Sequence, residues 1–316
     1  MSEAAPVGYQ NGRVVPAASL GWSLDDLGPK VGAIAVERLR TFGGRLHAAD
    51  EHYERFRQSC RGLGFEPPLA DAAAFAQLCE GLLRSNASWL GAGGDACVVV
   101  LASPGGGAPG QLSVLDHSAQ PTSIARLEPL PLSRLSAYYR GGVKLFLSSI
   151  RSVPASCWPP ALKTRSRLHY HLADREAAAR LGVGAVGLLL DGDGCVSDTS
   201  IAAVLIRRGR RLIGPPADRV LSGVTQRRLE PAIRRHFEAA RECISYAELA
   251  EADELLLLGS TGQVHAASTL DLSHSGRPAV EYPGVAGDAY RLLLDEAKAL
   301  VAFDFEAQAI QEMASF

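Results

Sequence analysis

Short apolar runs alternate with tight turns over the first fifty residues, a pattern that predicts strands paired in hairpins. Residues 7–16 hold two extended runs on either side of an Asn-Gly pair at 11–12, and this dipeptide is a strong short-range hairpin signal. Residues 33–40 and the Gly-Gly turn within 43–46 repeat the pattern. We therefore expect two hairpins before residue 50.

Helical spacing follows the second hairpin. The segment Ala49–Leu63 places large apolar residues three and four positions apart, with Asp50 as its expected N-cap, and Ala70–Ser85 shows the same spacing. Cys97–Leu101 is an uninterrupted apolar run typical of a buried strand. Elements in this order predict a small α+β domain over residues 1–125.

The rest of the chain interleaves apolar strands with amphipathic helices, which predicts a larger, barrel-like α/β domain over residues 143–316. The expected strands are 143–148, 185–190, 195–206, 212–213 and 254–258, and the expected helices are 167–181, 225–241 and 287–303. Pro231 inside the second of these helices predicts a kink or a late start. The proline-containing stretch 126–142 is expected to cross between the domains. The predicted fold class is α/β, with two unequal domains.

Composition limits the partners of the chain. Of its 316 residues, 47% are hydrophobic and 21% are charged, and the formal net charge is -2. A general nucleic-acid or membrane-surface binder needs a basic excess that this chain lacks. We expect a globular protein that binds neither nucleic acid nor membrane.

Cysteines and the first residues indicate the compartment. The six cysteines show no C-x-x-C pair and no regular spacing, so neither a metal site nor a disulfide framework is predicted. The first ten residues lack the basic start and apolar centre of a secretory signal, and no apolar run approaches membrane-spanning length. We therefore expect a reduced, cytoplasmic protein.

Lys163 is the residue whose chemistry stands out from this background. The chain holds four lysines against 28 arginines, so arginine serves where charge alone is needed. A buried lysine can lose its proton near neutral pH and attack a carbonyl to form a Schiff base, whereas arginine cannot. Lys163 lies on the turn that enters the predicted helix 167–181, from which a side chain can project into a cleft. For this stretch alone, the better interpretation is an ordinary surface lysine beside Arg165 and Arg167.

Several motifs occur along the chain in a fixed order. The first half carries DDLG at 25–28, ERLR at 37–40 and EHYERF at 51–56. With the segments that follow them, these motifs resemble the class IV aminotransferases, the fold-type-IV family of pyridoxal 5'-phosphate enzymes, over nearly the full length. The resemblance implies that Arg55 holds the cofactor phosphate, to which a guanidinium can donate two parallel charge-assisted hydrogen bonds.

Two segments of the second half resemble the reactive part of these enzymes. Residues 161–173 are similar to the segment with the Schiff-base lysine, which implies that role for Lys163. The next segment is similar to the strand whose glutamate pairs with the pyridine nitrogen; here Asp198, one methylene shorter, takes that position, and Ala203 replaces the usual asparagine. A carboxylate keeps that nitrogen protonated, so that the ring can withdraw electrons. The shorter side chain implies a shifted ring, an intervening water or a decayed site.

Two turns complete the resemblance. Val224 and Thr225 stand where the family's glycine-x-threonine-arginine turn meets the phosphate at a helix start, a place that favours anions, while Gln226 replaces the usual arginine. The resemblance further implies that Ser260 donates to the phosphate. The amides of Ser260 and Thr261 are expected to receive the substrate carboxylate.

The implied reaction is transfer of an amino group between an amino acid and a 2-keto acid, both small molecules. Lys163 would hold pyridoxal phosphate as a Schiff base and then shuttle a proton between the substrate and cofactor carbons. The resemblance also implies a homodimer.

The substrate and the type of reaction stay open at this point. Family members that act on branched-chain amino acids carry aromatic residues in the stretch corresponding to 31–36, where this chain has Val31 and Val36; we assign Val31 to the substrate side. Arg167 is also assigned there, and it makes the segment resemble the lyases of the aminodeoxychorismate type, which eliminate pyruvate. The substitutions at Asp198 and Ala203 leave a third reading, a degenerate family member that binds the cofactor without turnover.

Overall fold

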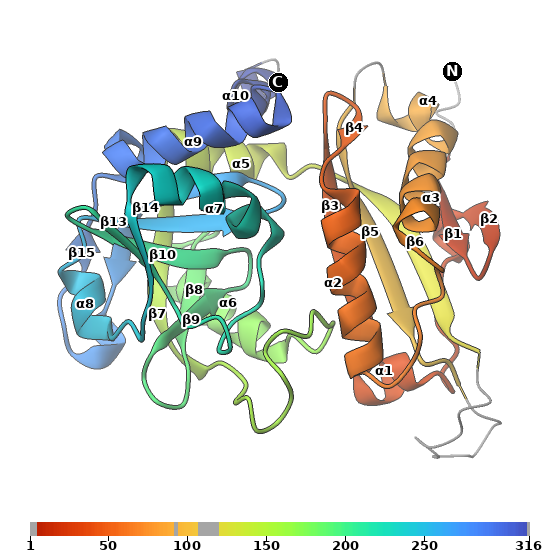
Figure 1. Cartoon of the computed structure of the whole chain (residues 1–316), viewed down its shortest axis with the longest axis horizontal. Helices are drawn as coiled ribbons and strands as arrows, with labels where there is room; N and C mark the ends of the chain where they lie inside the picture. The colour runs from red at the N-terminus through yellow and green to blue at the C-terminus, as the bar shows by residue number, and fades with distance from the viewer. Residues whose placement is uncertain (1–4, 92–93, 107–119, 315–316) are drawn as a thin grey trace. The chain divides into compact units, whose positions relative to one another are not determined.

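The computed structural model describes residues 5–91, 94–106 and 120–314, which divide into two units (Figure 1). The first unit comprises Met1–Leu130 and the short segment Leu162–Ser166, and the second comprises Pro131–Ala161 and Arg167–Phe316. The division after Leu130 lies within the stretch 126–142. The return of Leu162–Ser166 to the first unit has no counterpart in the predictions.

The stretch 126–142, which was expected to cross between the domains, consists mostly of regular elements. β6 (Thr122–Pro129) lies inside the sheet of the first unit, and α5 (Leu132–Gly141) opens the second unit. The prolines that suggested a linker stand at element ends, Pro129 closing the strand and Pro131 preceding the helix. A missing N–H at such positions does not interrupt a hydrogen-bond ladder.

An antiparallel sheet with the strand order β2-β1-β6-β5-β3-β4 forms the base of the first unit. The other elements of this unit are the strands β1 (Val7–Gln10), β2 (Arg13–Pro16), β3 (Ala35–Phe42), β4 (Arg45–Leu46) and β5 (Ala96–Ser103) and the helices α1 (Leu27–Val31), α2 (Ala49–Gly62), α3 (Ala72–Ser85) and α4 (Ala87–Leu90). Both predicted hairpins are confirmed, since β1 pairs with β2 and β3 pairs with β4. Asn11 and Gly12 turn the first of them with φ angles of 49° and 84°.

Each face of this sheet has its own apolar cluster. Phe56 of α2 and Phe75 of α3 pack with inward-facing residues of β3, β5 and β6 on one face. Val36, Val99 and Ile124 form a smaller cluster from the alternate strand positions, which project to the opposite face because side chains alternate along a strand.

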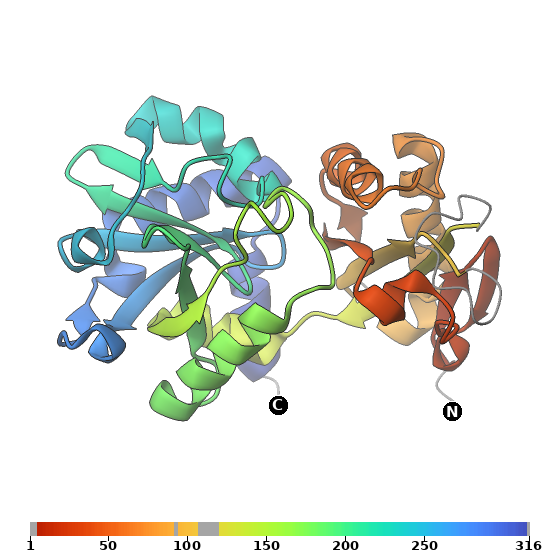
Figure 2. The ribbon, with the colours of Figure 1, turned by 90° about the horizontal axis from the view of Figure 1, so that it is seen from below.

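In the second unit, the sheet closes on itself. Its order is β12-β11-β10-β13-β14-β7-β8-β9, and β9 also pairs with β10, so the strands from β10 to β9 form a barrel (Figures 1 and 2). The strands are β7 (Val143–Arg151), β8 (Val186–Leu190), β9 (Val196–Thr199), β10 (Ala203–Arg208), β11 (Arg211–Gly214), β12 (Glu238–Arg241), β13 (Glu254–Gly259), β14 (Gln263–Asp271) and β15 (Val280–Glu281); the helices after α5 are α6 (Leu168–Leu181), α7 (Val224–His236), α8 (Tyr246–Ala250), α9 (Asp288–Val301) and α10 (Phe305–Ala314). The prediction of a barrel-like α/β domain is confirmed.

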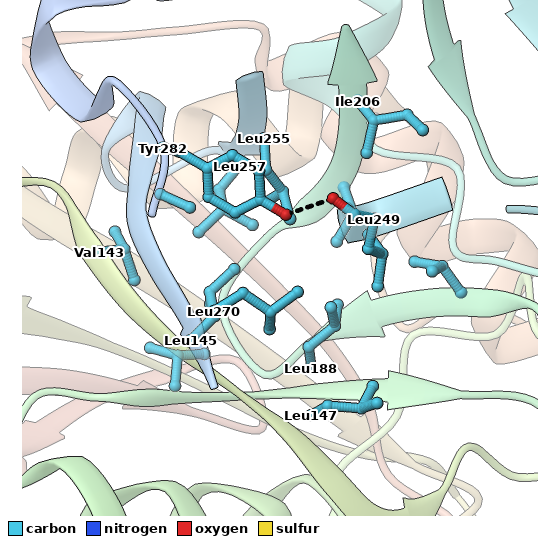
Figure 3. Packing of buried hydrophobic residues seen from close by; sticks show 14 of the residues in the cluster. Val143, Leu145, Leu147, Leu188, Ile206, Leu249, Leu255, Leu257, Leu270 and Tyr282 are labelled. Carbon is cyan, nitrogen blue, oxygen red and sulfur yellow. Dashed lines mark hydrogen bonds between the residues drawn. The ribbon is translucent and has the colours of Figure 1, made fainter. Parts of the chain in front are cut away.

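Leucines from all sides fill the barrel (Figure 3). Leu145, Leu188, Leu257 and Leu270 come from four different strands and belong to one fully buried cluster. Tyr282 joins this cluster and donates its hydroxyl to the Leu249 carbonyl at 2.6 Å, so that its buried polar atom is satisfied. α6 lies along β7 and β8, whereas α7 and α9 pack together.

Two predicted elements are divided differently in the structure. The expected strand 195–206 is a hairpin of β9 and β10, turned at residues 200–202. The expected helix 225–241 ends at His236, and the residues after it form β12, which pairs with β11 in parallel. No Gly or Pro marks the end of β9 or of α7 in the sequence. β10 and β12 form because they pair with strands that are distant in sequence, which local propensity does not reveal.

Helix starts also differ from the predictions. α7 begins at Val224, so Pro231 lies inside the helix and does not delay its start. The N-cap of α2 is Ala48, with a φ of 53°, and Asp50 lies within the first turn, where its charge still favours the helix dipole.

Cys195 and Cys243 form a disulfide with a Cα–Cα distance of 5.1 Å, so the expectation of a reduced chain without disulfides is wrong for this pair. The two residues are 48 positions apart, and no local motif marks such a pairing. The other four cysteines are thiols. Among the helices of residues 5–91, 94–106 and 120–314, none combines the length and the apolar character that a membrane crossing needs.

Candidate active site

The segment with Lys163 is fixed to the edge of β3 within the first unit. Thr164 forms a bridge with Ala35, and the Val36 N–H donates to the Lys163 carbonyl at 3.0 Å. On its other side, the Lys163 N–H donates to Ser59 Oγ of α2 at 3.0 Å. The backbone of Lys163 is therefore held from two elements while its side chain is half-buried.

A buried cluster of Glu37, His52 and Arg55 lies beside this segment. Arg55 of α2 donates to Glu37 of β3 through Nε at 2.7 Å and Nη2 at 2.9 Å, and His52 Nδ1 lies 2.7 Å from the same carboxylate. Ser59, which bonds to Lys163, donates to the Arg55 carbonyl at 2.9 Å. Ser59 thus contacts both Arg55 and Lys163, two residues that were assigned to the site separately from sequence.

The charges of the cluster are set by burial and by these bonds. Burial alone would raise the pKa of Glu37, but Arg55 and His52 hold it well below its usual range. Burial lowers the pKa of His52, and the charge of Lys163 acts in the same direction, against the pull of Glu37. Glu37 is therefore ionised and His52 neutral, and Arg55 is the guanidinium of the cluster, a group that suits a phosphate.

Val31 lies near the same segment. It ends α1 and is 59% exposed, and the next residue, Gly32, accepts a hydrogen bond from Ser166 Oγ at 2.9 Å. Val36, by contrast, is buried in the apolar cluster of its sheet face. The first unit therefore brings three of the predicted residues into one region: Val31, Arg55 and Lys163.

The predicted residues of the second unit converge around Ala203. Asp198 lies directly across the hairpin from Ala203, which in turn pairs with Leu258 of β13. Gly223, at the start of α7, approaches so closely that an added Cβ would lie 3.9 Å from the Ala203 Cβ. A Cβ on Gly259 would lie 2.6 Å from the Ile201 carbonyl, so the turn after β13 also lies here.

Helix α7 and this turn supply donors that suit an anion. Gly223 offers no side-chain cap to the 13-residue helix that begins at Val224 and Thr225, and the first N–H groups of a helix have no partner within it. Ser260 and Thr261 are half-buried in the turn. The Ser260 carbonyl accepts from Gln263 Nε2 at 3.0 Å, which helps to fix the turn.

Gln226 has an arginine beside it, although it replaces the family's arginine. When its amide oxygen is turned toward Arg241 of β12, it accepts from Nη1 at 3.1 Å and from Nη2 at 2.7 Å. The sequence analysis missed Arg241 because it placed this residue at the end of a helix. The guanidinium that contacts Gln226 in the first turn of α7 thus comes from a different element, β12.

Asp198 has a partner that the sequence analysis also missed. Tyr170, in the first turn of α6, donates its hydroxyl to both carboxylate oxygens at 2.8 Å. The Arg167 guanidinium lies 4.2 Å from the centre of the Tyr170 ring and donates to the Ser200 carbonyl. The spacing of Arg167 and Tyr170, one helical turn apart, is a sequence signal that could have suggested the contact between these two residues.

Comparison with known proteins gives a consistent answer. The sequence model described as amino-transferase class IV matches residues 35–268. A putative branched-chain-amino-acid aminotransferase of Methanocaldococcus jannaschii is 25% identical over 259 residues, which cover 81% of this chain and 85% of that protein.

Solved structures share the fold. The branched-chain aminotransferase of Thermoproteus uzoniensis with norvaline superimposes with a TM-score of 0.80 at 20% identity, covering 96% of this chain and 97% of that one. The branched-chain amino acid aminotransferase of Thermobaculum terrenum in its PLP form gives 0.79 at 20% identity, with 98% and 97% covered.

Proposed function

The chain belongs to the class IV aminotransferase family, and from this premise we propose that it transfers the amino group of a branched-chain amino acid to a 2-keto acid. The family makes the protein an aminotransferase with pyridoxal 5'-phosphate as its cofactor. The substrate class rests on the relatives, which are named as branched-chain enzymes. A homodimer is part of the proposal on the resemblance alone.

Lys163 is the residue proposed to bind the cofactor covalently, and the observation that carries this is its fixed backbone beside the Arg55 cluster. A covalent anchor must present its amine in a constant direction. Lys30 and Lys298 have acidic partners at 3.2 Å or less, and Lys144 is exposed on β7. Lys163 combines partial burial with a cationic neighbourhood that attracts a phosphate ester.

The donors present fit the cofactor. Arg55, the first amides of α7 at Val224 and Thr225, and the Ser260 hydroxyl are proposed to hold its phosphate. Ser200 Oγ, two residues after Asp198, is buried and has no hydrogen-bond partner among the described residues. A polar group of a ligand would satisfy it.

Bound pyridoxal phosphate supplies an electron sink that makes the substrate Cα–H acidic. The chain has to orient the substrate and move the proton. We assign proton removal and return to the Lys163 amine, because a free amine at that place is a general base. Asp198 supplies negative charge for the ring nitrogen, and the amides of Ser260 and Thr261 receive the substrate carboxylate.

An apolar donor side chain agrees with Val31, the predicted substrate residue that is 59% exposed in the first unit. An apolar side chain favours a branched aliphatic group over a charged one. Valine at this position, in the stretch where relatives have aromatic residues, supports a wider space for the donor.

The lyase alternative is not favoured. Its one supporting residue, Arg167, already has a local role, since it lies over the Tyr170 ring and donates to the Ser200 carbonyl. The relatives that match the chain are aminotransferases. Substrate recognition by Arg167 therefore stays a prediction without further support.

The test is a visible spectrum of the purified protein with pyridoxal phosphate, followed by borohydride reduction and peptide mapping. We expect a long-wavelength band and a reduced adduct on Lys163, both lost in Lys163→Ala and both kept in Lys144→Ala. Branched-chain amino acids should bleach the band, and a 2-keto acid should restore it. An adduct on another lysine, or pyruvate release without a keto acid, would refute the proposal.

A further inference from the structure

The Tyr170 hydroxyl lies at the end of the Asp198 side chain, so that a phenol oxygen stands where a plain carboxylate would otherwise end. An oxygen at 2.8 Å from both carboxylate oxygens lies in front of the carboxyl group, on the side away from its own Cβ. A glutamate would carry its carboxylate further in that same direction by one methylene. The phenol oxygen therefore prolongs the short side chain of Asp198.

The Tyr170 hydroxyl is a donor toward Asp198 and an acceptor toward anything else. A phenol has one proton to donate and two lone pairs, and the proton is shared by the two Asp198 oxygens. Burial, and then the charge of Asp198, raises the pKa of Tyr170 well above its usual value, so the oxygen stays protonated and neutral at physiological pH. The bond to Asp198 polarises the phenol and makes its oxygen a better acceptor.

Two neighbouring side chains contact the ring of Tyr170. The Arg167 guanidinium lies over it at 4.2 Å, and His169 lies 4.1 Å from it between ring centroids. A cation over an aromatic face is attracted by the ring quadrupole. The phenol oxygen is thus a preorganised group, as a cofactor contact requires.

We propose that the Tyr170 oxygen, with Asp198 behind it, is the acceptor that this chain presents to the pyridine nitrogen of the cofactor. This rests on the proposed function. The ring N–H would donate to a neutral oxygen polarised by a carboxylate, and the Glu-to-Asp change would be compensated by Tyr170. Asp198 would then act through Tyr170, as a positioning and polarising residue.

Cofactor affinity of the apoprotein separates this arrangement from direct contact with Asp198. We expect Tyr170→Phe to weaken pyridoxal phosphate binding about tenfold, the loss of one hydrogen bond to a charged donor. Adding Asp198→Glu to Tyr170→Phe should restore the affinity, because the longer carboxylate reaches the place of the phenol oxygen. Tyr246→Phe is the matched control, since its ring also lies under an arginine, Arg277, at 4.9 Å.

Direct contact between Asp198 and the nitrogen predicts the opposite result. Removing the Tyr170 bond would leave a more basic carboxylate, so that Tyr170→Phe would bind the cofactor as tightly as the wild type or more tightly. That result, or a failure of Asp198→Glu to restore affinity, would overturn the proposal. Failure of the wild type to form an adduct on Lys163 would instead refute the proposed function, and this inference with it.

A measurement on the ring nitrogen guards against a variant that does not fold. With cofactor labelled with nitrogen-15 in the ring, the wild type should show a protonated pyridine nitrogen. A fluorinated tyrosine incorporated at position 170 keeps the shape and weakens the acceptor, so the nitrogen signal should move. An unprotonated nitrogen in the wild type, or a signal that the fluorinated residue leaves unchanged, would contradict the proposal.

Discussion

Each unit holds a buried carboxylate among its own candidate site residues, but these two carboxylates have different partners. Glu37 accepts from the Arg55 guanidinium and contacts His52, whereas Asp198 accepts from the neutral phenol of Tyr170. A cation cancels the charge of a buried carboxylate, while a phenol only solvates it. We infer that Glu37 serves to fix a cation, Arg55, and that Asp198 orients a neutral phenol, Tyr170.

The arginines show the same contrast. Arg55 uses its guanidinium plane on a carboxylate, and Arg167 lays its plane over an aromatic ring. The first arrangement orients a cation by paired hydrogen bonds, and the second orients a phenol without neutralising its partner.

Removal of Glu37 should have the largest effect on folding. Glu37→Ala removes the buried carboxylate that Arg55 and His52 both contact, and we expect a loss of about 3–5 kcal/mol in the free energy of unfolding. Glu128→Ala is the control, because it breaks a partly exposed ion pair with Arg38 and should change stability by about 1 kcal/mol or less. Urea unfolding measures both losses. Equal losses for Glu37→Ala and Glu128→Ala would mean that the buried ion pair of Glu37 contributes no more to stability than a partly exposed one.

Loss of the disulfide of the second unit should have the next largest effect on stability. Cys195 directly precedes β9, the strand of Asp198, and its partner Cys243 follows β12. The closed loop of 48 residues predicts a loss of about 2–4 kcal/mol in the double variant Cys195→Ser and Cys243→Ser. Thermal unfolding of the oxidised protein, with the exposed thiol variant Cys157→Ser as control, measures it. A double variant as stable as this control would show that the backbone bonds around Cys195 suffice.

What could be predicted from sequence follows the range of the interactions. The Asn11-Gly12 hairpin and helix α2 were predictable because their signals lie within a few residues. The alternation of apolar strands and amphipathic helices predicted the barrel-like domain, and the order of motifs identified the family. The bond from Tyr170 to Asp198, the disulfide and the pairing of β12 could not be predicted, because each joins residues 27 or more positions apart, with no local pattern for the pairing.

The site shows the same limit at the level of single residues. The family pattern suggested Arg55 and Asp198, but a pattern of positions does not tell which atoms surround a side chain. Glu37 belongs to the ERLR motif at 37–40, but its role as the partner of Arg55 was not predicted, because the sequence does not show that the two residues lie opposite each other. The roles of the site residues therefore remain proposals that the variants test.

The smallest expected effect concerns pH and the buried His52. Its pKa is lowered in the folded protein, chiefly by burial. Below about pH 6.5, the unfolded chain therefore binds a proton at this histidine that the folded chain does not bind. This stability is fully present above the unfolded pKa and is lost as the pH falls toward the folded pKa, with a slope of up to about 1.4 kcal/mol per pH unit. His52→Asn, which can keep a bond to Glu37, should flatten the slope between pH 6.5 and 5.

The pH window also separates the two members of the first cluster. Glu37 has a depressed pKa as well, but its contribution is lost only below the usual pKa of a free glutamate, about 4.3. The difference between the urea midpoints of the wild type and of His52→Asn from pH 7 to 5 therefore reports on His52 and not on Glu37, with the exposed His274 changed to Asn as the control. Equal slopes in the wild type and His52→Asn would mean that His52 is protonated in the folded state, so that the cluster holds one more cation and Glu37 would balance two charges instead of one.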